Sequence, residues 1–404
     1  MANSDTCPLV ISGLGVISAL GHDRSSFWSE LVAGRSGIRP CACNEEDLKG
    51  YPGALVQDYL PEHYFPEDAL PLLDRFSQFA LIAGREALRD AALDPDARDE
   101  CAAVIGTGCG GKQTDEQTYA QLYKAGRKRV HPLTIPRGMP SAAASQVSID
   151  LGISGPVFSV VSACASGAHA LIQGMLLVRA GMARSALVGA SDAPFTYGLM
   201  KSWEALRVLS RDTCRPFSAD RTGLVLGEGA AMMVIEPADQ AERRGAPVYA
   251  TIEGCGQSAD ANHITRPDLE GVTMAQRRAL QHAGLSPASI GYINAHGTGT
   301  AANDPLETSA IRAVFGAHAD ALPVSATKSM HGHALGAASA MELVATALAL
   351  HHQLIPPTAN YTGVDPACDL DYVTDGARSH RFDYALSESF AFGGLNAAVI
   401  LGRP

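Results

Sequence analysis

The sequence predicts an α/β protein made of two similar halves, and three observations support this fold class. Short apolar segments alternate with helical stretches along the chain, which is the pattern of α/β proteins. In each half, one strand leads into a turn of small residues and then into a long Ala-rich helix. The 404 residues are 46% hydrophobic and 18% charged, which is enough apolar surface for a large buried core.

The expected strands are short apolar segments bounded by glycine, proline or polar residues. They fall at residues 8–15, 102–108, 157–163, 185–191, 230–236, 248–256, 290–296, 323–327 and 396–402. The expected helices are longer and fall at residues 75–93, 166–181, 272–284 and 338–353. A polar segment with proline at both ends, residues 237–247, marks the join, so the predicted halves are residues 1–245 and 246–404.

Composition excludes several classes of protein. The net charge of -11 argues against a general nucleic-acid binder, which needs a basic face. No apolar run reaches about 18 residues, so no membrane span is expected, and the N-terminal segment lacks the pattern of a signal peptide. The nine cysteines are scattered and form no CxxC pair, which indicates reduced thiols in a cytoplasmic protein rather than a zinc or redox site.

One cysteine stands where a strand is expected to turn into a helix, in 160-VVSACASGAHALIQG-174. Cys164 at a helix start lies in the positive end of the helix dipole, which predicts a lowered pKa and a reactive thiolate. The small residues around it permit a tight bend and a close substrate approach, as in the nucleophile elbow of serine hydrolases. The alternative is a buried structural cysteine, because free cysteines are often inert core residues.

Three further stretches supply groups that suit a cysteine nucleophile. A predicted strand ends at His296 in 293-INAHGTGT-300, and Lys328 and His333 follow another strand in 325-SATKSMHGHALGAA-338. Each histidine taken alone could be structural. The glycines of 389-SFAFGGLNAAV-399 could expose backbone N–H groups to an oxyanion.

Two other interpretations of these stretches are weaker. His331 and His333 form an HxH pair that could bind a metal, but no acidic ligand lies beside them and zinc-type spacing is missing. A phosphate loop is the rival interpretation of the glycine-rich segment, but the chain has no GxxxxGK[ST] pattern. We therefore expect no metal site.

Together these stretches resemble the condensing enzymes of fatty acid and polyketide synthesis, of the β-ketoacyl-[acyl carrier protein] synthase II type. The ordered set of Cys, HGTGT, KSMxGH and FGG is highly specific, and the resemblance covers nearly the whole chain. Further matches are 10-VISGLGVISALG-21, 74-DRFSQFAL-81, 215-RPFSADRTGLVLGEGA-230 and 303-NDPLE-307. The resemblance implies a thiolase-like fold, in which two pseudo-duplicated halves form a five-layered αβαβα sandwich.

The resemblance also implies roles for the matching residues. Cys164 is expected to accept the acyl chain, while His296 and His333 promote malonyl decarboxylation and stabilise the enolate. Lys328 is expected to orient the histidine site with Glu307 as its ion partner. The backbone N–H groups of Cys164 and Phe392 are expected to form the oxyanion hole, with Phe392 as a gate and Phe390 as a supporting residue.

The implied reaction is a decarboxylative Claisen condensation of malonyl-ACP with an acyl chain held on Cys164. A thioester keeps the acyl group activated, and two imidazole donors can stabilise the enolate if an inward nitrogen carries a proton. No metal or redox cofactor is expected, since the substrates travel on the phosphopantetheine arm of an acyl carrier protein.

Several positions depart from the synthase II pattern. Cys109 replaces the usual isoleucine of the acyl pocket, and Thr134 stands where a phenylalanine often reaches the pocket across the dimer. Leu395 and Ala391 replace a threonine and a glycine of the FGG turn, and Trp203 is expected to line the pocket. The hypothesis is a bulkier, more polar or unsaturated acyl chain; simple drift is the alternative.

Carrier docking is predicted at a basic cluster. The segment 66-PEDALPLLDRF-76 is acidic and apolar where the family often has basic residues. Basic residues remain at other docking positions, and acyl carrier proteins are acidic. These residues are Arg127, Lys128, Arg129 and Arg207. An ordinary solvated charge cluster is the alternative.

Other functional classes fit less well. A non-catalytic chain-length factor typically lacks the nucleophilic cysteine, although this chain could be the active subunit of a ketosynthase/chain-length-factor heterodimer. A Cys-His hydrolase needs an oriented general base, which Lys328 does not suit. Priming-type synthases use a Cys-His-Asn set, against which His333 argues. We expect a homodimer or such a heterodimer, without assigning the pathway or the chain length.

Overall fold

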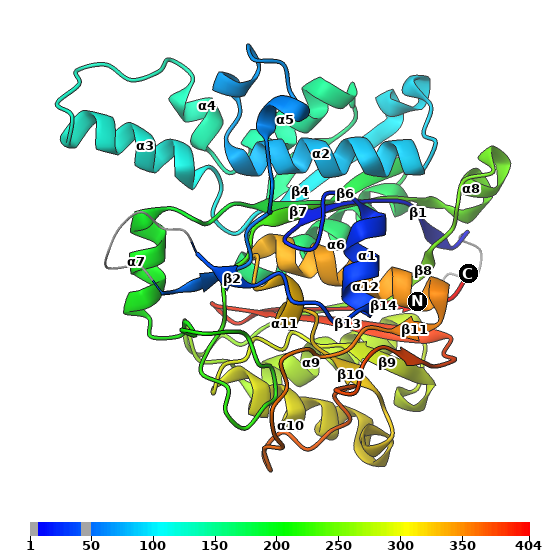
Figure 1. The fold of residues 1–404 in the computed structure, drawn as a ribbon. Coiled ribbons are helices and arrows are strands. Elements are labelled where there is room, and N and C mark those ends of the chain that lie inside the picture. The colour runs from blue at the N-terminus through cyan, green and yellow to red at the C-terminus, as the bar shows by residue number, and fades with distance from the viewer. Residues whose placement is uncertain (1–6, 42–49) are drawn as a thin grey trace.

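Two five-stranded sets with the same topology form the main sheet of the computed structural model, which describes residues 7–41 and 50–404 (Figure 1). The first set is β1 (Leu9–Ser18), β4 (Cys101–Gly106), β5 (Val157–Val160), β6 (Ser185–Asp192) and β7 (Gly229–Pro237). The second set is β8 (Ala250–Ala259), β9 (Ile290–Asn294), β10 (Val324–Ser325), β13 (Tyr384–Ala391) and β14 (Leu395–Gly402). Cys43 and residues 1–6, which the cysteine and signal-peptide predictions include, lie outside the described residues.

The sheet order is β10-β9-β13-β14-β8-β1-β7-β6-β4-β5. Within each set the first strand pairs antiparallel with the fifth, the fifth antiparallel with the fourth, and the remaining strands are parallel. The two sets join where Val10 and Ile11 of β1 pair with Thr251 and Ala250 of β8. The equal topology agrees with a duplicated unit, whereas the division at residue 245 stays a prediction.

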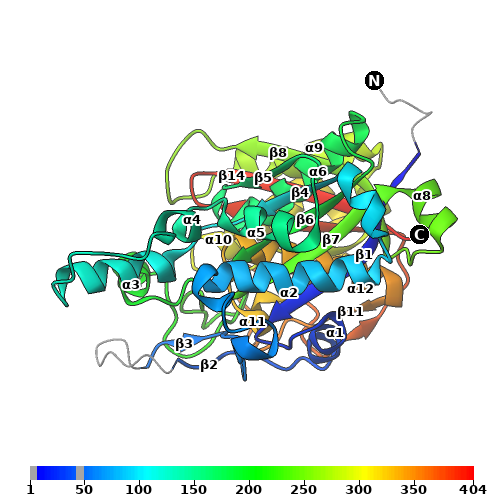
Figure 2. The ribbon, with the colours of Figure 1, turned by 90° about the horizontal axis from the view of Figure 1, so that it is seen from above.

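Helices occupy three layers around the two sets of strands, which gives the five-layered αβαβα sandwich (Figures 1 and 2). One outer layer contains α2 (Arg75–Asp90) and α5 (Ala142–Leu151), and the other contains α9 (Leu269–Ala283) and α10 (Asn303–Phe315). The middle layer contains α6 (Ser166–Arg179) and α12 (Gly336–His352). Residues 336–350 of α12 are all buried, as expected for a helix covered on every side.

The helices α6 and α12 approach each other closely because small residues face their contact. A Cβ atom on Gly167 would lie 2.7 Å from the backbone nitrogen of Ala340, which no side chain could tolerate. This contact holds the start of α6, and with it the residues just before the helix, against the second half of the chain.

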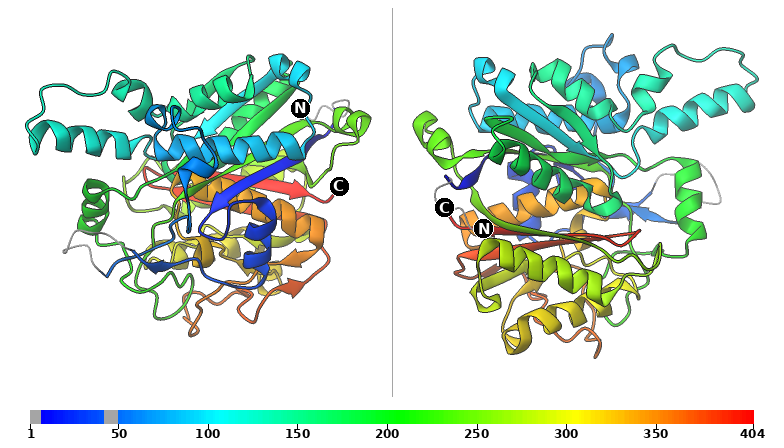
Figure 3. Two further views of the ribbon diagram at one scale, coloured as in Figure 1. Left: turned by 45° about the horizontal axis from the view of Figure 1, so that its top comes forward. Right: turned by 180° about the vertical axis from the view of Figure 1, so that it is seen from behind.

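The remaining elements lie around this sandwich. The helices α3 (Lys112–Tyr123) and α4 (Thr134–Gly138), with the loop between them, form an arm that projects from the body (Figure 3). The other helices are α1 (Arg24–Val32), α7 (Tyr197–Ala205), α8 (Ala238–Arg244) and α11 (Lys328–His331). Two short ribbons pair β2 (Arg39–Pro40) with β3 (Pro52–Gly53), and β11 (Leu354–Ile355) with β12 (Arg378–Ser379).

All nine predicted strands and four predicted helices are present, with ends shifted by a few residues. The prediction at 323–327 shrinks to the two residues of β10. The strand β13 was not predicted, and its polar residues Ser387, Glu388 and Ser389 are all buried in the sheet. No helix among the described residues has the length and apolar character that a membrane span requires.

Candidate active site

Cys164 lies in a 3₁₀ turn, Ala163–Ala165, between the end of β5 and the start of α6. The preceding residue Ala163 has a φ of +50°, a left-handed conformation that is costly for any residue with a Cβ atom. This bend presents the thiol at the floor of a pocket, where Cys164 is 7% exposed. The structure therefore confirms the predicted strand-to-helix bend.

The predicted low pKa of the thiol is wrong. Burial raises the pKa of Cys164 to about 11, because the thiolate loses its hydration in this pocket. Lys328 and the backbone N–H groups of Phe392 and Cys164 act in the opposite direction. The helix dipole favours the thiolate less than the loss of hydration disfavours it.

The raised pKa predicts a strong pH dependence of Cys164 alkylation. Because the thiol stays protonated below its pKa, the thiolate fraction rises about tenfold per pH unit in that range. Between about pH 7 and about pH 9, the iodoacetamide labelling rate at Cys164 should therefore rise roughly a hundredfold. Mass spectrometry of the peptide that contains Cys164 measures this rate, and a plateau reached below about pH 8 would contradict the raised pKa.

His296 follows β9 and is fixed from two sides. The Nζ atom of Lys328 donates to the backbone oxygen of His296 at 2.6 Å and lies 3.2 Å from its Nδ1 atom. The carboxylate of Glu307 accepts hydrogen bonds from the backbone N–H groups of His296 at 2.6 Å and Gly297 at 2.8 Å. Both contacts hold the imidazole at the end of the strand.

The predicted ion partner of Lys328 is wrong. Lys328 forms its ion pair with Glu342 of α12, and both side chains are fully buried. Glu307 contacts the backbone beside His296 and the side-chain amide of Asn303 at 2.9 Å instead. Glu342 is the only Asp, Glu, Lys or Arg residue of the Ala-rich helix α12. A buried charge requires a partner, so that lone glutamate was an available signal in the sequence.

His333 is positioned by the strained turn that follows α11. The backbone N–H of Leu335, whose φ is +49°, donates to Nδ1 of His333 at 3.1 Å. Since Nδ1 accepts this bond, the neutral imidazole carries its proton on Nε2. The ammonium of Lys328 imposes the same tautomer on His296 by donating to its Nδ1.

Both imidazoles are neutral at physiological pH. Burial, followed by the neighbouring Lys328, holds the pKa values of His296 and His333 well below the usual value for histidine. The two rings lie 5.6 Å apart between centroids, at 89° to each other. Two neutral N–H donors therefore lie near one point of the pocket, as enolate stabilisation requires.

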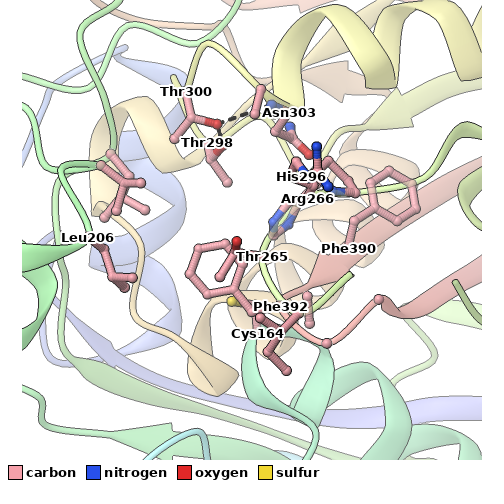
Figure 4. Close-up of a pocket in the computed structure, with 18 of the residues that line it drawn as sticks. Cys164, Leu206, Thr265, Arg266, His296, Thr298, Thr300, Asn303, Phe390 and Phe392 are labelled. Atoms are coloured by element: carbon pink, nitrogen blue, oxygen red, sulfur yellow. Dashed lines mark hydrogen bonds between the residues drawn. The ribbon is translucent and has the colours of Figure 1, made fainter. Parts of the chain in front are cut away.

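The pocket brings Cys164, His296 and His333 together. Figure 4 shows Cys164 and His296 in this pocket with the aromatic side chains of Phe390 and Phe392. Phe390 lies 5.9 Å from the His296 ring between centroids. Phe392 stacks on Trp203 at 5.9 Å. The backbone N–H of Phe392 also hydrogen-bonds the sulfur of Cys164, so it is directed to the atom where an acyl group would be attached.

The other predicted pocket residues lie outside this lining. The thiol of Cys109 donates to Asp192 at 3.2 Å, and Cys109 packs on the same apolar cluster as Trp203. Thr134 begins α4 on the projecting arm and donates to the backbone oxygen of His131 at 2.8 Å. Roles for Cys109 and Thr134 in binding the acyl chain stay predictions.

The basic residues occupy two places. Arg127, Lys128 and Arg129 lie exposed in the loop between α3 and α4, on the arm. Arg207 lies exposed after α7, between two residues that line the pocket, Leu206 and Val208. His331 was considered above as a metal ligand together with His333. Both ring nitrogens of His331 form hydrogen bonds, Nδ1 with the backbone oxygen of Gly332 and Nε2 with the hydroxyl of Thr327.

Two features of the site were not identified in the sequence. Asp192 is fully buried and accepts hydrogen bonds from the Cys109 backbone at 3.1 Å and the Gly336 backbone at 2.9 Å, so it links the two halves behind the pocket. The loop that carries residues 263–267 also lines the pocket. That loop has no regular periodicity, so no sequence pattern indicated its position.

The fold and the site define a class of acyl-transferring enzymes in which a buried thiol works beside two neutral imidazoles. Two family models match this chain: "Beta-ketoacyl synthase, N-terminal domain" over residues 6–241 and "Beta-ketoacyl synthase, C-terminal domain" over residues 249–362. The chain belongs to the β-ketoacyl synthase family and is a condensing enzyme that forms carbon–carbon bonds.

Relatives of known name cover almost the whole chain. Nodulation protein E of Rhizobium sp. (strain N33) is 48% identical over 97% of this chain and 98% of its own length. The 3-oxoacyl-[acyl-carrier-protein] synthase 2 of Coxiella burnetii is 39% identical over 98% of each chain. The solved structure of the ishigamide ketosynthase/chain length factor superposes with a TM-score of 0.94 at 34% identity, over 99% of this chain and 100% of that chain.

Proposed function

We propose that Cys164 receives an acyl chain from an acyl carrier protein thioester and that His296 and His333 direct the attack of a malonyl-derived enolate on it. The observation that carries this proposal is the convergence of donors on the pocket floor. The N–H group of Phe392 is directed at the Cys164 sulfur, and both imidazoles hold their protons on Nε2. These groups match the two oxyanions that the reaction creates.

The first half-reaction transfers the acyl chain. The Cys164 sulfur attacks the thioester carbonyl, the pantetheine sulfur leaves, and the Cys164 proton ends on that leaving sulfur. The backbone N–H groups of Cys164 and Phe392 stabilise the tetrahedral oxyanion. Because burial raises the pKa of the Cys164 thiol, the thiol must give up this proton as part of acyl transfer.

The second half-reaction forms the new carbon–carbon bond. Malonyl thioester loses its carboxylate as carbon dioxide, and the electron pair of the broken bond becomes an enolate. The Nε2–H groups of His296 and His333 donate to the enolate oxygen. The enolate carbon then attacks the acyl carbonyl, and the Cys164 sulfur leaves as a thiolate. This thiolate takes up one proton from water, because the original Cys164 proton left with the pantetheine thiol. These steps balance without a metal or a redox cofactor, so we propose that the enzyme uses neither.

We propose that the acyl chain is unsaturated or polar and not a saturated fatty chain. Cys109 is smaller and more polar than the isoleucine that it replaces, and it contacts the same apolar cluster as Trp203. Among the similar proteins, nodulation protein E is named for nodulation and the ishigamide ketosynthase for ishigamide, and neither is named for fatty acid synthesis. Both observations favour a specialised pathway over primary fatty acid synthesis.

Intact-protein mass spectrometry with a panel of acyl carrier protein thioesters tests this proposal. We expect acyl adducts on the wild-type protein with unsaturated or polyketide-like chains, at rates about tenfold above those for saturated chains of equal length. Cys109→Ile should narrow that difference, because it restores the larger apolar side chain. Strict preference for saturated long chains would contradict the proposal that the acyl chain is unsaturated or polar. If no thioester in the panel gave an acyl adduct, the proposed role of Cys164 would be contradicted.

The exposed basic residues and one sheet edge suggest how partners bind. We propose that the cluster Arg127–Arg129, together with Arg207 at the pocket rim, receives an acidic carrier protein.

The strand β5 ends the sheet, and Phe158 and Val161 beside that edge are 38% and 56% exposed. An unpaired apolar edge favours pairing with a second chain. The proposed assembly is a homodimer or, by analogy with the ishigamide ketosynthase/chain length factor, a heterodimer with a chain-length factor.

A further inference from the structure

The loop between β8 and α9 forms one wall of the pocket above Cys164. Five consecutive residues of this loop, His263–Pro267, line the pocket (Figure 4). The loop is fixed to the glycine-rich turn opposite, because the N–H of Gly393 donates to the oxygen of Ile264 at 2.7 Å. The N–H of Asp260 donates to the oxygen of Gly394 at 2.9 Å. The side chains of the loop are therefore held at the pocket, beside the catalytic groups.

Arg266 presents its guanidinium from this wall. The Nδ1 atom of His263 accepts hydrogen bonds from the backbone N–H groups of Thr265 at 3.1 Å and Arg266 at 3.2 Å, which fixes the turn. The side chain of Arg266 is exposed and makes no hydrogen bond or ion pair with any described residue. Its five N–H donors are available to a ligand that enters the pocket.

The rest of the pocket lining holds no acidic side chain and no second lysine or arginine among the described residues. Among the described lining residues there is no Asp, Glu or Lys, both catalytic histidines are neutral, and Arg266 is the only arginine. Apart from Arg266 and the two catalytic histidines, the polar side chains of the lining are those of His263, Thr265, Thr298, Thr300 and Asn303. A single guanidinium in a pocket without acidic side chains selects a ligand with one anionic group, and its forked geometry suits a phosphate or a carboxylate.

The substrate offers two such anions at different depths. The malonyl carboxylate must lie near His296 and His333, which are 3% and 2% exposed at the pocket floor. The phosphodiester of the phosphopantetheine arm lies at the opposite end of the arm from the thioester, toward the carrier protein and solvent. Arg266 is exposed, so its position fits the phosphodiester and not the carboxylate.

We propose that Arg266 binds the phosphodiester of the phosphopantetheine arm during acyl transfer to Cys164. This proposal rests on the function proposed above. It adds a substrate-binding residue that distinguishes a phosphorylated pantetheine thioester from an unphosphorylated one, independently of the carrier protein.

The test uses two small thioesters, hexanoyl-pantetheine and hexanoyl-4′-phosphopantetheine, and measures the rate of Cys164 acylation by intact-protein mass. Wild-type protein should react about tenfold faster with the phosphorylated thioester at low substrate concentration, as expected for one exposed charge-assisted contact. Arg266→Gln should abolish this ratio, because the rate with the phosphorylated thioester falls to that with hexanoyl-pantetheine. Arg277→Gln is the matched control, since Arg277 is exposed on α9 and does not line the pocket.

The other outcomes overturn the proposal. An unchanged ratio in Arg266→Gln would mean that the phosphate is bound elsewhere. If Arg266→Gln lowered the acylation rate with acyl carrier protein thioesters but not with the small phosphorylated thioester, Arg266 would contact the carrier protein and not the phosphodiester. If Arg266→Gln lowered only the rate of the malonyl half-reaction, Arg266 would bind the malonyl carboxylate. Failure of both thioesters to acylate wild-type Cys164, at any concentration, would instead contradict the proposed function itself.

Discussion

Replacing Cys164 with alanine is expected to lower the rate of condensation at least about a thousandfold, as is typical when the nucleophile of a covalent mechanism is lost. Alanine offers no atom that can hold the acyl chain, so the acyl adduct should disappear from the mass spectrum. The imidazoles of His296 and His333 are held by Lys328 and by the Leu335 backbone, not by Cys164. Decarboxylation of malonyl-ACP should therefore continue in the variant, and carbon dioxide release measures it.

A second cysteine provides the control for this experiment. Cys255 on β8 is also partly buried, and burial raises its pKa to about 11, but it lies outside the pocket. Cys255→Ala should keep the acyl adduct and the condensation rate of the wild-type protein. Retention of the adduct in Cys164→Ala would place the nucleophile elsewhere, and equal loss in both variants would indicate a general effect on folding.

Replacing Glu342 with alanine is expected to lower the free energy of unfolding by roughly 3–5 kcal/mol, the usual cost of leaving one member of a buried ion pair alone. Lys328 and Glu342 are both fully buried, so the ammonium of Lys328 would lose its counter-charge without gaining contact with water. The rate of condensation should fall as well. Lys328 donates hydrogen bonds to Nδ1 and to the backbone oxygen of His296, and so fixes both the tautomer and the position of this residue. Urea unfolding followed by tryptophan fluorescence measures the stability.

The double variant Lys328→Met/Glu342→Leu separates charge from packing. Two apolar side chains of similar volume remove both charges, so most of the lost stability should return. Condensation should stay low, since no ammonium then faces Nδ1 of His296. Glu307→Gln tests the other possible partner. If Glu307→Gln lowered the free energy of unfolding as much as Glu342→Ala, and if replacing Lys328 then cost less stability than in the wild-type protein, Lys328 would pair with Glu307 and not with Glu342.

The parts of the site that depend on local sequence were predictable. The apolar segment before Cys164 and the small residues after it define the strand-to-helix bend, and His296 and Lys328 each follow a predicted strand. The left-handed conformation of Ala163 was not predictable, because alanine normally avoids it and only the surrounding packing enforces it.

The parts that depend on contacts between distant segments were harder to predict. Glu342 is 14 residues after Lys328, and no local pattern decides whether Lys328 pairs with it or with Glu307. The pKa of Cys164 depends on burial, which is a property of the assembled pocket. The strand β13 was missed because Ser387, Glu388 and Ser389 have side chains typical of solvent-facing positions, although all three are buried.

The middle layer of the sandwich has a consequence for how the protein folds during synthesis. The helix α6 packs on α12, which is translated far later, after both histidines of the site. Until α12 leaves the ribosome, the surfaces of α6, β6 and β7 that α12 contacts are uncovered, and exposed apolar surface of this kind promotes aggregation. Chain segments that end before α12 are therefore expected to require a chaperone, and neither half should be expressible as an independent, monomeric fragment.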